Sequence, residues 1–209
     1  MSNSNSLLQK VLKFQKNFQT GKPIHILFCD IQDKYLPKIY NYKDIISTSE
    51  DIAEASKLLN LNQIITEHKK EIFGETIGEI KKHYYEKTQV LSKTRFSMVD
   101  EEMLKSHDKD SVYVLLGIEA HVCVTQTALS ILDYGRELII LSDGVSSVNR
   151  GDRNVALRNL SNLGAYVTTS QSFLFLLLKD AKHPSFKFLL PILKRFSERE
   201  NKLLNEAKF

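Results

Sequence analysis

The sequence predicts an α/β protein, built as a single-domain, doubly wound parallel sheet of about six strands with helices on both faces. Two observations predict this fold. Short apolar runs alternate about six times with segments whose apolar residues recur at helical spacing. The segments between the runs are long enough for the crossovers that join parallel strands. With 209 residues, of which 42% are apolar, the chain can bury one sizeable core.

Each expected strand is a short apolar run bounded by polar residues. IHILFCD at 24–30 and SVYVLL at 111–116 are typical of strands that are covered on both faces. NQIITEH at 62–68 and TQVLSK at 88–93 end in a basic or ionisable residue. The expected strands are 24–30, 62–68, 88–93, 111–116, 137–143 and 165–170.

The helices are indicated by apolar residues three and four positions apart. In the clearest case Val124, Ala128 and Ile131 share one face, and Gly135 stands where a helix C-cap belongs. We therefore expect helices at 44–61, 75–83, 101–107, 121–134, 152–164, 172–181 and 184–200.

The ends of the chain differ from its middle in composition. Residues 1–20 start polar and then predict a short amphipathic helix that packs on the domain. Residues 21–195 form the α/β domain, and residues 196–209 form a charged tail that we expect to be solvated.

Composition excludes some classes of function. The net charge of +4 is small and scattered, so we expect no nucleic-acid partner. The longest apolar run is far shorter than a membrane span, so we expect no membrane partner. Cys29 and Cys123 are the two cysteines, and no secretory signal precedes them; free thiols in the cytoplasm are therefore the expectation.

Three reactive side chains follow expected strands. Asp30 ends the first strand, Lys93 ends the third, and Cys123 comes soon after the fourth. Ligands of open parallel sheets bind beyond the carboxyl ends of the strands, so these groups can converge on one crevice. A carboxylate can accept the thiol proton, a lysine can stabilise both anions, and the thiolate can attack a carbonyl carbon.

Cys123 also lies at a strand-to-helix junction, where backbone N–H groups and the helix dipole stabilise a thiolate. The alternative is a small buried core residue, which describes most free cysteines. Asp30 and Lys93 have equally plain alternatives, as a turn cap and a solvated charge. Cys29 should alternate away from Asp30 along the strand, and we expect it to be buried and inert.

Several blocks, in this order, carry a resemblance to a known family. The sequence resembles the isochorismatase-like cysteine hydrolases, and most closely their eukaryotic isochorismatase-domain branch, over roughly residues 20–195. The GIEAHVCV segment joined to TTS and HPSFK is the most specific part. The blocks are LFCDIQDKY (27–35), IITEHKKEIFGETI (64–77), LSKTRFSMV (91–99), GIEAHVCVTQTALSIL (117–132), LSDGVSS (141–147) and GAYVTTSQSFLFLLLKDAKHPSFK (164–187).

The resemblance implies a catalytic triad of Asp30, Lys93 and Cys123. Asp30 is then the general base and later the acid, Lys93 bridges carboxylate and sulfur, and Cys123 forms the covalent acyl intermediate. It also implies a cis peptide bond between Ile118 and Glu119 that aims backbone N–H groups at the oxyanion. A Rossmann-like hydrolase domain over 21–195 follows from the same likeness.

Departures from the family narrow the reaction. Nicotinamidase relatives carry a metal-binding Asp and His set after the second strand, whereas TEHKKEIFG (66–74) has Glu67 and His68 at this point. We therefore expect no metal and no cofactor, and nicotinamide is an unfavoured substrate. True isochorismatases lack the cysteine, so their reaction is unfavoured too.

Further residues near the strand ends are candidates for the substrate pocket. Each has a structural alternative, such as surface exposure for the two that follow Asp30 or a polar helix start for the one before Cys123. The candidates are Gln32, Tyr35, Glu67, His68, Phe96, Ser97 and His121.

The sequence thus predicts a hydrolase that cleaves an amide-type C–N bond of a small molecule, and the resemblance implies a homo-oligomer. The rival interpretation is a catalytically silent oligomeric binding or scaffold protein with the same fold. The intact set of Asp30, Lys93 and Cys123 favours the enzyme.

Overall fold

The computed structural model describes residues 8–9, 11–12, 15–16 and 19–205 of the chain. Its centre is one sheet of parallel strands in the order β3-β2-β1-β4-β5-β6. This confirms the doubly wound α/β fold. The strands are β1 (Ile24–Cys29), β2 (Asn62–His68), β3 (Thr88–Lys93), β4 (Val112–Ile118), β5 (Glu137–Ser146) and β6 (Tyr166–Thr168).

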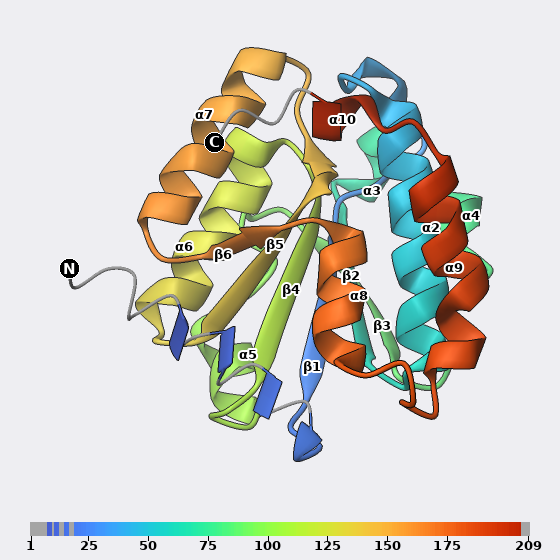
Figure 1. The fold of residues 1–209 in the computed structure, drawn as a ribbon. Helices are drawn as coiled ribbons and strands as arrows, with labels where there is room; N and C mark the ends of the chain where they lie inside the picture. Colours follow the sequence, from blue (N-terminus) through green and yellow to red (C-terminus); the bar gives the residue numbers. More distant parts are fainter. Residues whose placement is uncertain (1–7, 10, 13–14, 17–18, 206–209) are drawn as a thin grey trace.

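Helices cover both faces of the sheet. In Figure 1, α6 and α7 lie on one side of the strands, and α2, α8 and α9 lie on the other. The helices are α2 (Tyr42–Leu58), α3 (Lys70–Phe73), α4 (Gly78–Lys81), α5 (Glu101–Ser106), α6 (Thr125–Asp133), α7 (Arg150–Asn162), α8 (Ser170–Leu178), α9 (Phe186–Glu198) and α10 (Lys202–Asn205). A 3-10 turn, η1 (Leu36–Lys38), follows β1, and a π-helix, η2 (Ala120–Val124), precedes α6.

The core is densest around the two central strands. Every residue of β1 and β4 is buried, because helices cover them above and below and strands flank them on both edges. The edge strand β3 is only partly covered, and Val90 in it is 43% exposed. Burial on both faces explains why the segments 24–29 and 112–118 are mostly apolar in sequence.

The strand order reverses between β1 and β4, because the chain runs outward to β2 and β3 before it returns. Crevices at such a switch point are where open α/β sheets bind ligands. Cys29 pairs with Gly117 of β4 and with Thr66 of β2 in the sheet register. The carboxyl ends of these strands therefore bring residues that are far apart in sequence to one place.

Some element boundaries differ from those expected. The helix expected at 75–83 is found as the shorter α4, and a further short helix, α3, precedes it and ends at Gly74 with φ +82°. The start of the expected helix 121–134 is the π-helix η2 rather than a regular first turn. β5 continues to Ser146, and its pairing with β4 shifts register between Leu115 and Gly117.

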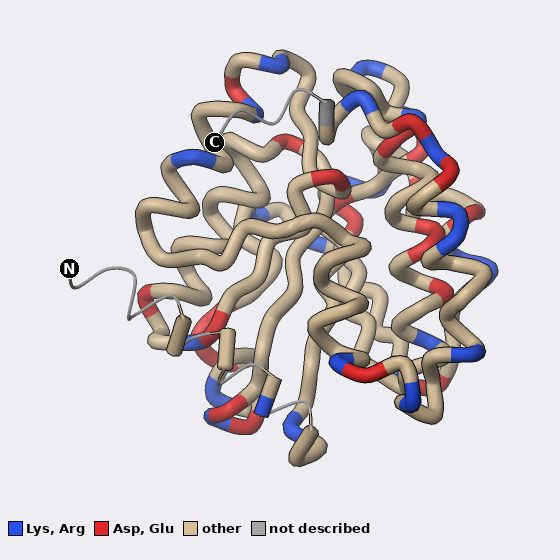
Figure 2. Tube along the Cα trace, in the orientation of Figure 1, with Lys and Arg blue, Asp and Glu red and all other residues tan. Residues whose placement is uncertain are grey.

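The charged tail expected from 196 onward is partly a folded element. Leu203 is fully buried and Asn201 is 7% exposed, so these two residues pack on the domain, whereas Lys202 and Leu204 are exposed. Asp51 of α2 explains part of this: it binds Arg195 of α9 at 2.6 Å and also pairs with Arg199. Figure 2 shows basic and acidic residues interspersed along α2 and α9.

The N-terminal extension at 1–20 falls largely outside the described residues. Among the positions that are described there, Leu8 and Leu12 are helical and 54% and 48% exposed, so packing of these two on the domain is not found.

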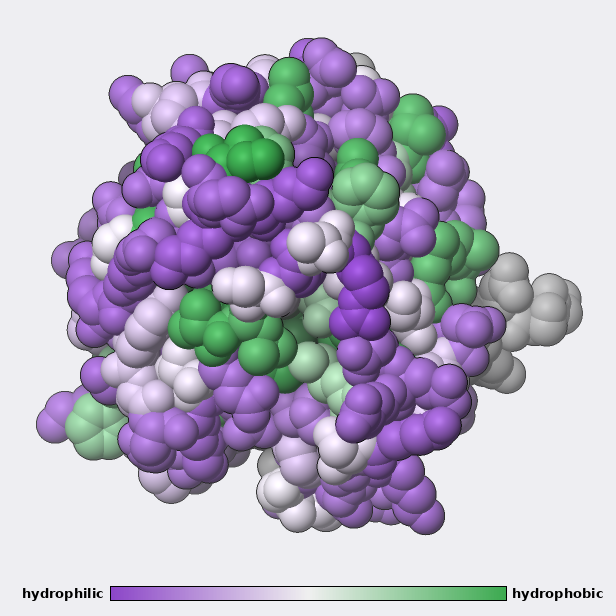
Figure 3. Space-filling model, turned by 180° about the vertical axis from the view of Figure 1, so that it is seen from behind, coloured by the Kyte–Doolittle hydropathy of each residue, from purple (hydrophilic) through white to green (hydrophobic). Residues whose placement is uncertain are grey.

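The surface offers separate apolar patches. Seen from behind, most of it is hydrophilic, and the apolar side chains gather in several distinct places (Figure 3). The strongly exposed apolar residues come from different elements, among them Ile72 at 56% and Phe188 at 66%. None of the helices in the described part combines the length and the apolar composition needed to cross a membrane.

Candidate active site

Asp30 follows the last residue of β1 in a left-handed backbone conformation, with φ 54°. Aspartate tolerates this region better than most residues, and such outliers cluster at functional sites. The turn ends the alternation of the strand, so the Asp30 carboxylate lies on the same side as the preceding thiol, 3.7 Å from Cys29 Sγ. The expectation that Cys29 points away from Asp30 is therefore wrong.

The Asp30 carboxylate is fully engaged. Its Oδ2 accepts a hydrogen bond from Lys93 Nζ at 2.7 Å, and its Oδ1 accepts one from the Thr66 hydroxyl at 2.7 Å. The side chains of Asp30 and Lys93 are each 6% exposed. A buried charge is costly unless it is paired and hydrogen-bonded, and this pair meets both conditions.

Lys93 is held at three points by its ammonium group. Besides Asp30, Nζ donates to the carbonyl oxygens of Arg95 at 3.1 Å and Phe96 at 3.0 Å. Burial by itself lowers the pKa of Lys93, but the adjacent Cys29, Asp30 and Cys123 groups outweigh burial and raise that pKa above its usual value. Lys93 is therefore a fixed cation at the centre of the site.

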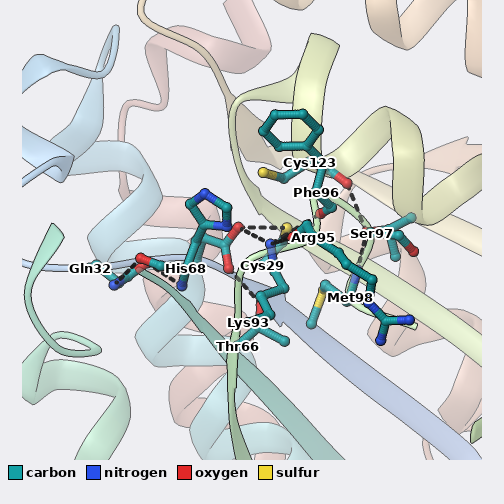
Figure 4. Close-up of polar contacts among 12 residues, drawn as sticks. Cys29, Gln32, Thr66, His68, Lys93, Arg95, Phe96, Ser97, Met98 and Cys123 are labelled. Atoms are coloured by element: carbon teal, nitrogen blue, oxygen red, sulfur yellow. Dashed lines mark hydrogen bonds and ion pairs between the residues drawn. The ribbon is translucent and has the colours of Figure 1, made fainter. Parts of the chain in front are cut away.

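Cys123 lies in the π-helix η2 that joins β4 to α6, and its residue is 7% exposed. Its carbonyl oxygen accepts a hydrogen bond from the Thr127 hydroxyl at 2.7 Å, which holds the junction to α6. In Figure 4 the side chains of Cys29, Lys93 and Cys123 converge from different elements. The three predicted triad residues are thus close together in the fold.

Cys29 is fully buried beneath them. Burial is the largest cause that raises the pKa of its thiol well above the usual value, followed by the hydrogen bond with the Cys123 thiol and the Asp30 charge. Of the two thiols, only Cys123 lines the cavity.

The expected cis peptide bond between Ile118 and Glu119 is not found, since the described residues contain no cis bond. The chain leaves β4 through a left-handed Glu119 instead, with φ 55°. The Glu119 carbonyl oxygen then accepts a hydrogen bond from Val122 N at 2.9 Å, which closes the first turn of η2. A left-handed residue, and not a cis peptide bond, thus turns the chain from β4 into η2.

A cavity of about 340 Å³ opens above Asp30 and Cys123. Its size is at the lower end of ligand pockets, which suits a small molecule. Two aromatic contacts shape its wall: Tyr35 packs against Phe73 at 5.2 Å, and His68 stacks on Phe96 at 5.9 Å between ring centres. The lining residues are Asp30, Gln32, Tyr35, His68, Phe73, Phe96, Ile118, Glu119, His121, Val122 and Cys123.

Two predicted pocket residues lie elsewhere. Glu67 is buried below the cavity, where its Oε1 accepts hydrogen bonds from the Thr76 amide and hydroxyl at 2.8 and 3.0 Å. Ser97 bonds the Val99 carbonyl at 2.8 Å and approaches Ser130 at 3.1 Å, so it fixes the loop after β3. Both serve their own loops and do not line the cavity.

Gln32 does line the cavity, but its amide is already used. Its Nε2 donates to the carbonyls of His68 and Gly74, and its Oε1 accepts from the His68 amide at 2.8 Å. Gln32 therefore ties β2 and the α3 loop to the turn after Asp30, which makes it a wall and not a free ligand group.

Sequence reasoning missed Phe73, Val122 and Thr66. Thr66 had a signal, because it is a polar residue inside the apolar run of β2, in register with Cys29. Phe73 and Val122 had none, since a single apolar residue in a loop or helix start is typical of packing.

Two pocket groups have displaced proton affinities. Burial, then the Glu119 contact and charge, raise the pKa of Tyr35 to about 12. Burial, followed by the Lys93 charge, lowers the pKa of His68, which is therefore neutral at pH 7. Within the described ranges, no group of three or more His, Cys, Asp or Glu side chains is placed to hold a metal ion.

Comparisons with known proteins agree with this architecture. The family model described as "Isochorismatase domain" matches residues 25–172. Isochorismatase family protein 1A of Dictyostelium discoideum is 38% identical over 173 residues, which cover 80% of this chain and 84% of that protein. Isochorismatase domain-containing protein 2 of Danio rerio is 36% identical over 171 residues, covering 80% and 85%.

A solved structure shows the same fold over nearly the whole chain. The structure of a protein named MAR1 ribonuclease, from Caenorhabditis elegans, superimposes with a TM-score of 0.82 at 30% identity, covering 90% of this chain and 97% of that one. The likeness in sequence and structure agrees with the site geometry and the sheet order, and the chain belongs to the isochorismatase family of hydrolase-like α/β proteins.

Proposed function

We propose that this protein is a cysteine hydrolase that cleaves an amide-type C–N bond of a small molecule, with Asp30, Lys93 and Cys123 as its catalytic triad. The observation that carries the proposal is the buried Asp30–Lys93 pair, joined at 2.7 Å, next to a cavity that Asp30 and Cys123 both line. A buried ion pair beside an accessible thiol is costly to maintain and is the arrangement that nucleophilic catalysis needs.

The first half of the reaction makes a thioester. Asp30 takes the proton of the Cys123 thiol, and Lys93 stabilises both anions. The sulfur then attacks the carbonyl carbon, which gives a tetrahedral oxyanion. When that intermediate collapses, the C–N bond breaks and Asp30 returns its proton to the leaving nitrogen, so that an amine departs and an S–acyl bond remains.

The second half hydrolyses the thioester. Asp30 takes a proton from water, the hydroxide attacks the acyl carbon, and the C–S bond breaks with the proton returned to sulfur. In both halves the oxyanion would be received by backbone N–H groups at the start of η2 and α6, that of Cys123 among them. The positive end of the helix dipole favours charge at this place.

The test is to trap the acyl enzyme. Purified protein is incubated with a panel of small amides and esters, and intact mass spectrometry is used to look for an added acyl group and for product acid. We expect an adduct on Cys123 and turnover that Cys123→Ala lowers by at least about 10³-fold. Cys29→Ala is the matched control, since it removes the thiol that does not line the cavity.

The rival binding or scaffold function predicts a different outcome. It requires that no substrate acylates Cys123 and that iodoacetamide modifies Cys123 no faster in the wild type than in Lys93→Met. Slower alkylation of Cys123 in Lys93→Met than in the wild type supports the enzyme, because a fixed cation stabilises the reacting thiolate.

A ribonuclease-like activity, which the name of the C. elegans protein suggests, has less support. RNA-binding grooves follow the phosphates with unpaired basic residues. Here the lysine of the site is neutralised by Asp30, and Glu119 adds a negative charge to the cavity.

We also propose a homo-oligomeric state, as the family resemblance implies, and a cytoplasmic location that suits two free cysteines.

A further inference from the structure

Glu119 places a second carboxylate in the cavity, and this one is only half satisfied. Its Oε1 accepts a hydrogen bond from the Tyr35 hydroxyl at 2.5 Å. Its Oε2 is buried and has no hydrogen-bond partner among the described residues. The side chain is 14% exposed and lines the same cavity as Cys123. A carboxylate oxygen is therefore held out of water beside the pocket, with the half-exposed His121 ring next to it.

The neighbouring groups do not neutralise it with a fixed cation. His121 Nδ1 lies 3.5 Å from Glu119 Oε2, but the same nitrogen approaches Ser147 Oγ at 3.1 Å, and the ring is 40% exposed. The other nitrogen of His121 is 4.0 Å from Asp152, so a protonated His121 would be shared between Glu119 and Asp152. Lys93 is committed to Asp30 and to two carbonyl oxygens.

The groups around the cavity carry an excess negative charge. Asp30 and Lys93 cancel, which leaves the Glu119 carboxylate as the excess charge among the ionised groups at the site. A buried carboxylate oxygen without a partner costs free energy, and a ligand that donates a hydrogen bond to it recovers that cost. A negative charge inside a low-dielectric cleft also attracts cations from solution.

We propose that Glu119 binds a positively charged nitrogen of the substrate, so that the substrate is a small cationic amide. The ammonium or amidinium group would meet Oε2, while the amide carbonyl meets Cys123. This inference rests on the proposed hydrolase function for the reaction, but the binding site itself does not depend on it.

The rest of the cavity fits this class of ligand. The rings of Tyr35, Phe73 and Phe96 line the wall, and aromatic faces attract a desolvated cation in addition to the ionic contact. The Tyr35 hydroxyl fixes Oε1, so the free oxygen is held in one orientation. A cavity of about 340 Å³ leaves room for a short chain or one ring between the two groups.

The test compares amides of matched shape and different charge. The pair is 4-aminobutanamide, which is cationic, and pentanamide, its neutral isostere; succinamic acid is the anionic member. Binding is measured by titration calorimetry on Cys123→Ala, which holds the ligand without turnover. We expect the cationic amide to bind about 10- to 100-fold more tightly than the neutral one, the range typical of a hydrogen bond to a charged group.

The matched variant is Glu119→Gln, which keeps an oxygen for Tyr35 and removes the charge. It should abolish the preference for the cation while leaving the binding of pentanamide within about twofold, and urea unfolding checks that it is folded. Equal binding of the cationic and neutral amides, preference for the anion, or a cation preference that survives in Glu119→Gln overturns the proposal.

The same pair separates this proposal from the hydrolase. Preferential binding without acylation of Cys123 in the wild type supports the Glu119 site and refutes the hydrolase. Hydrolysis of both amides at equal kcat/KM supports the hydrolase and refutes the Glu119 site. If none of the three amides binds at millimolar concentration, the cation site is refuted for short-chain amides, the class that the cavity fits.

Discussion

The two carboxylates of the cavity, Asp30 and Glu119, follow neighbouring strands and differ in how they are satisfied. Asp30 is bound by a cation and a hydroxyl, one on each oxygen. Glu119 is bound by one neutral hydroxyl, and its second oxygen is left without a hydrogen bond among the described residues. Both reach their positions through the same device, a left-handed residue just beyond the end of a parallel strand, with φ 54° and 55°.

This difference fits the two proposed roles, catalysis for Asp30 and substrate recognition for Glu119. A group that takes and returns protons must be held in one place, and the contacts of Asp30 suit this proposed role. A group that selects a ligand must keep bonding capacity for it, and the unbonded Oε2 of Glu119 suits the recognition role proposed for it. One turn geometry thus serves two purposes, and the partners of each carboxylate decide which.

The largest effect is expected from removing the partner of Asp30. Lys93→Met keeps the length of the side chain but leaves a buried carboxylate without its cation, which typically costs about 3–5 kcal/mol. We expect urea unfolding to show a loss of this order, together with slower alkylation of Cys123.

The double variant Asp30→Asn/Lys93→Met is the control for this prediction. Because it removes both charges, it should recover most of the lost stability while it remains inactive. A single Lys93→Met variant as stable as the wild type would contradict the prediction that Lys93 offsets the cost of burying the Asp30 carboxylate.

A smaller loss is expected at Gly117, which sets the backbone under the Asp30 end. A Cβ at this residue would lie 2.4 Å from the Cys29 carbonyl oxygen and 2.5 Å from Cys29 Cβ, and its φ is +147°. Gly117→Ala must therefore displace the end of β1, and we expect a loss of about 2–4 kcal/mol in urea unfolding.

Gly135→Ala is the matched control for Gly117. Gly135 also has a positive φ, +70°, but a Cβ there meets nothing within 4 Å. Its variant should cost only the backbone strain, about 1 kcal/mol. Equal losses at the two glycines would show that crowding against Cys29 is unimportant and that the Asp30 end tolerates a shift of β1.

The sequence was sufficient for the frame of the site. Strands at 62–68 and 88–93 have the predicted bounds, because in both a short apolar segment is bounded by polar residues. Parallel strands with crossovers then require their carboxyl ends to meet, and this places Asp30, Lys93 and Cys123 together. These predictions depend on pattern alone.

The parts that could not be predicted depend on single dihedral angles and on contacts between distant segments. Nothing in LFCDIQ indicates the positive φ of Asp30, which decides that Cys29 lies beside it. The pairing of Tyr35 with Glu119 joins residues 84 positions apart. Leu203 looked like part of a solvated tail because four of the nine residues from 196 to 204 are charged, and only the fold shows the pocket that buries it.

The smallest effect separates the two carboxylates directly, through the titration of Tyr35. The pKa of Tyr35 is raised to about 12, by burial first and then by the contact with Glu119 and its charge, from an ordinary value near 10. Because the folded pKa is raised, its contribution to stability is complete below about pH 10 and is lost as the pH rises through 12. Ultraviolet absorbance of tyrosinate, taken as wild type minus Tyr35→Phe, isolates this group.

In that titration Glu119→Gln should lower the pKa of Tyr35 part of the way toward 10, since burial remains when the charge is gone. Asp30→Asn should leave the titration unchanged, because Asp30 is neutralised by Lys93 and is not among the causes of the Tyr35 shift. If instead both variants move the titration equally, the two carboxylates act on the cavity as one diffuse charge. The proposed division of roles between Asp30 and Glu119 then fails. A carboxylate attracts a substrate cation only if no nearby positive charge cancels its own charge at the place where the ligand lies.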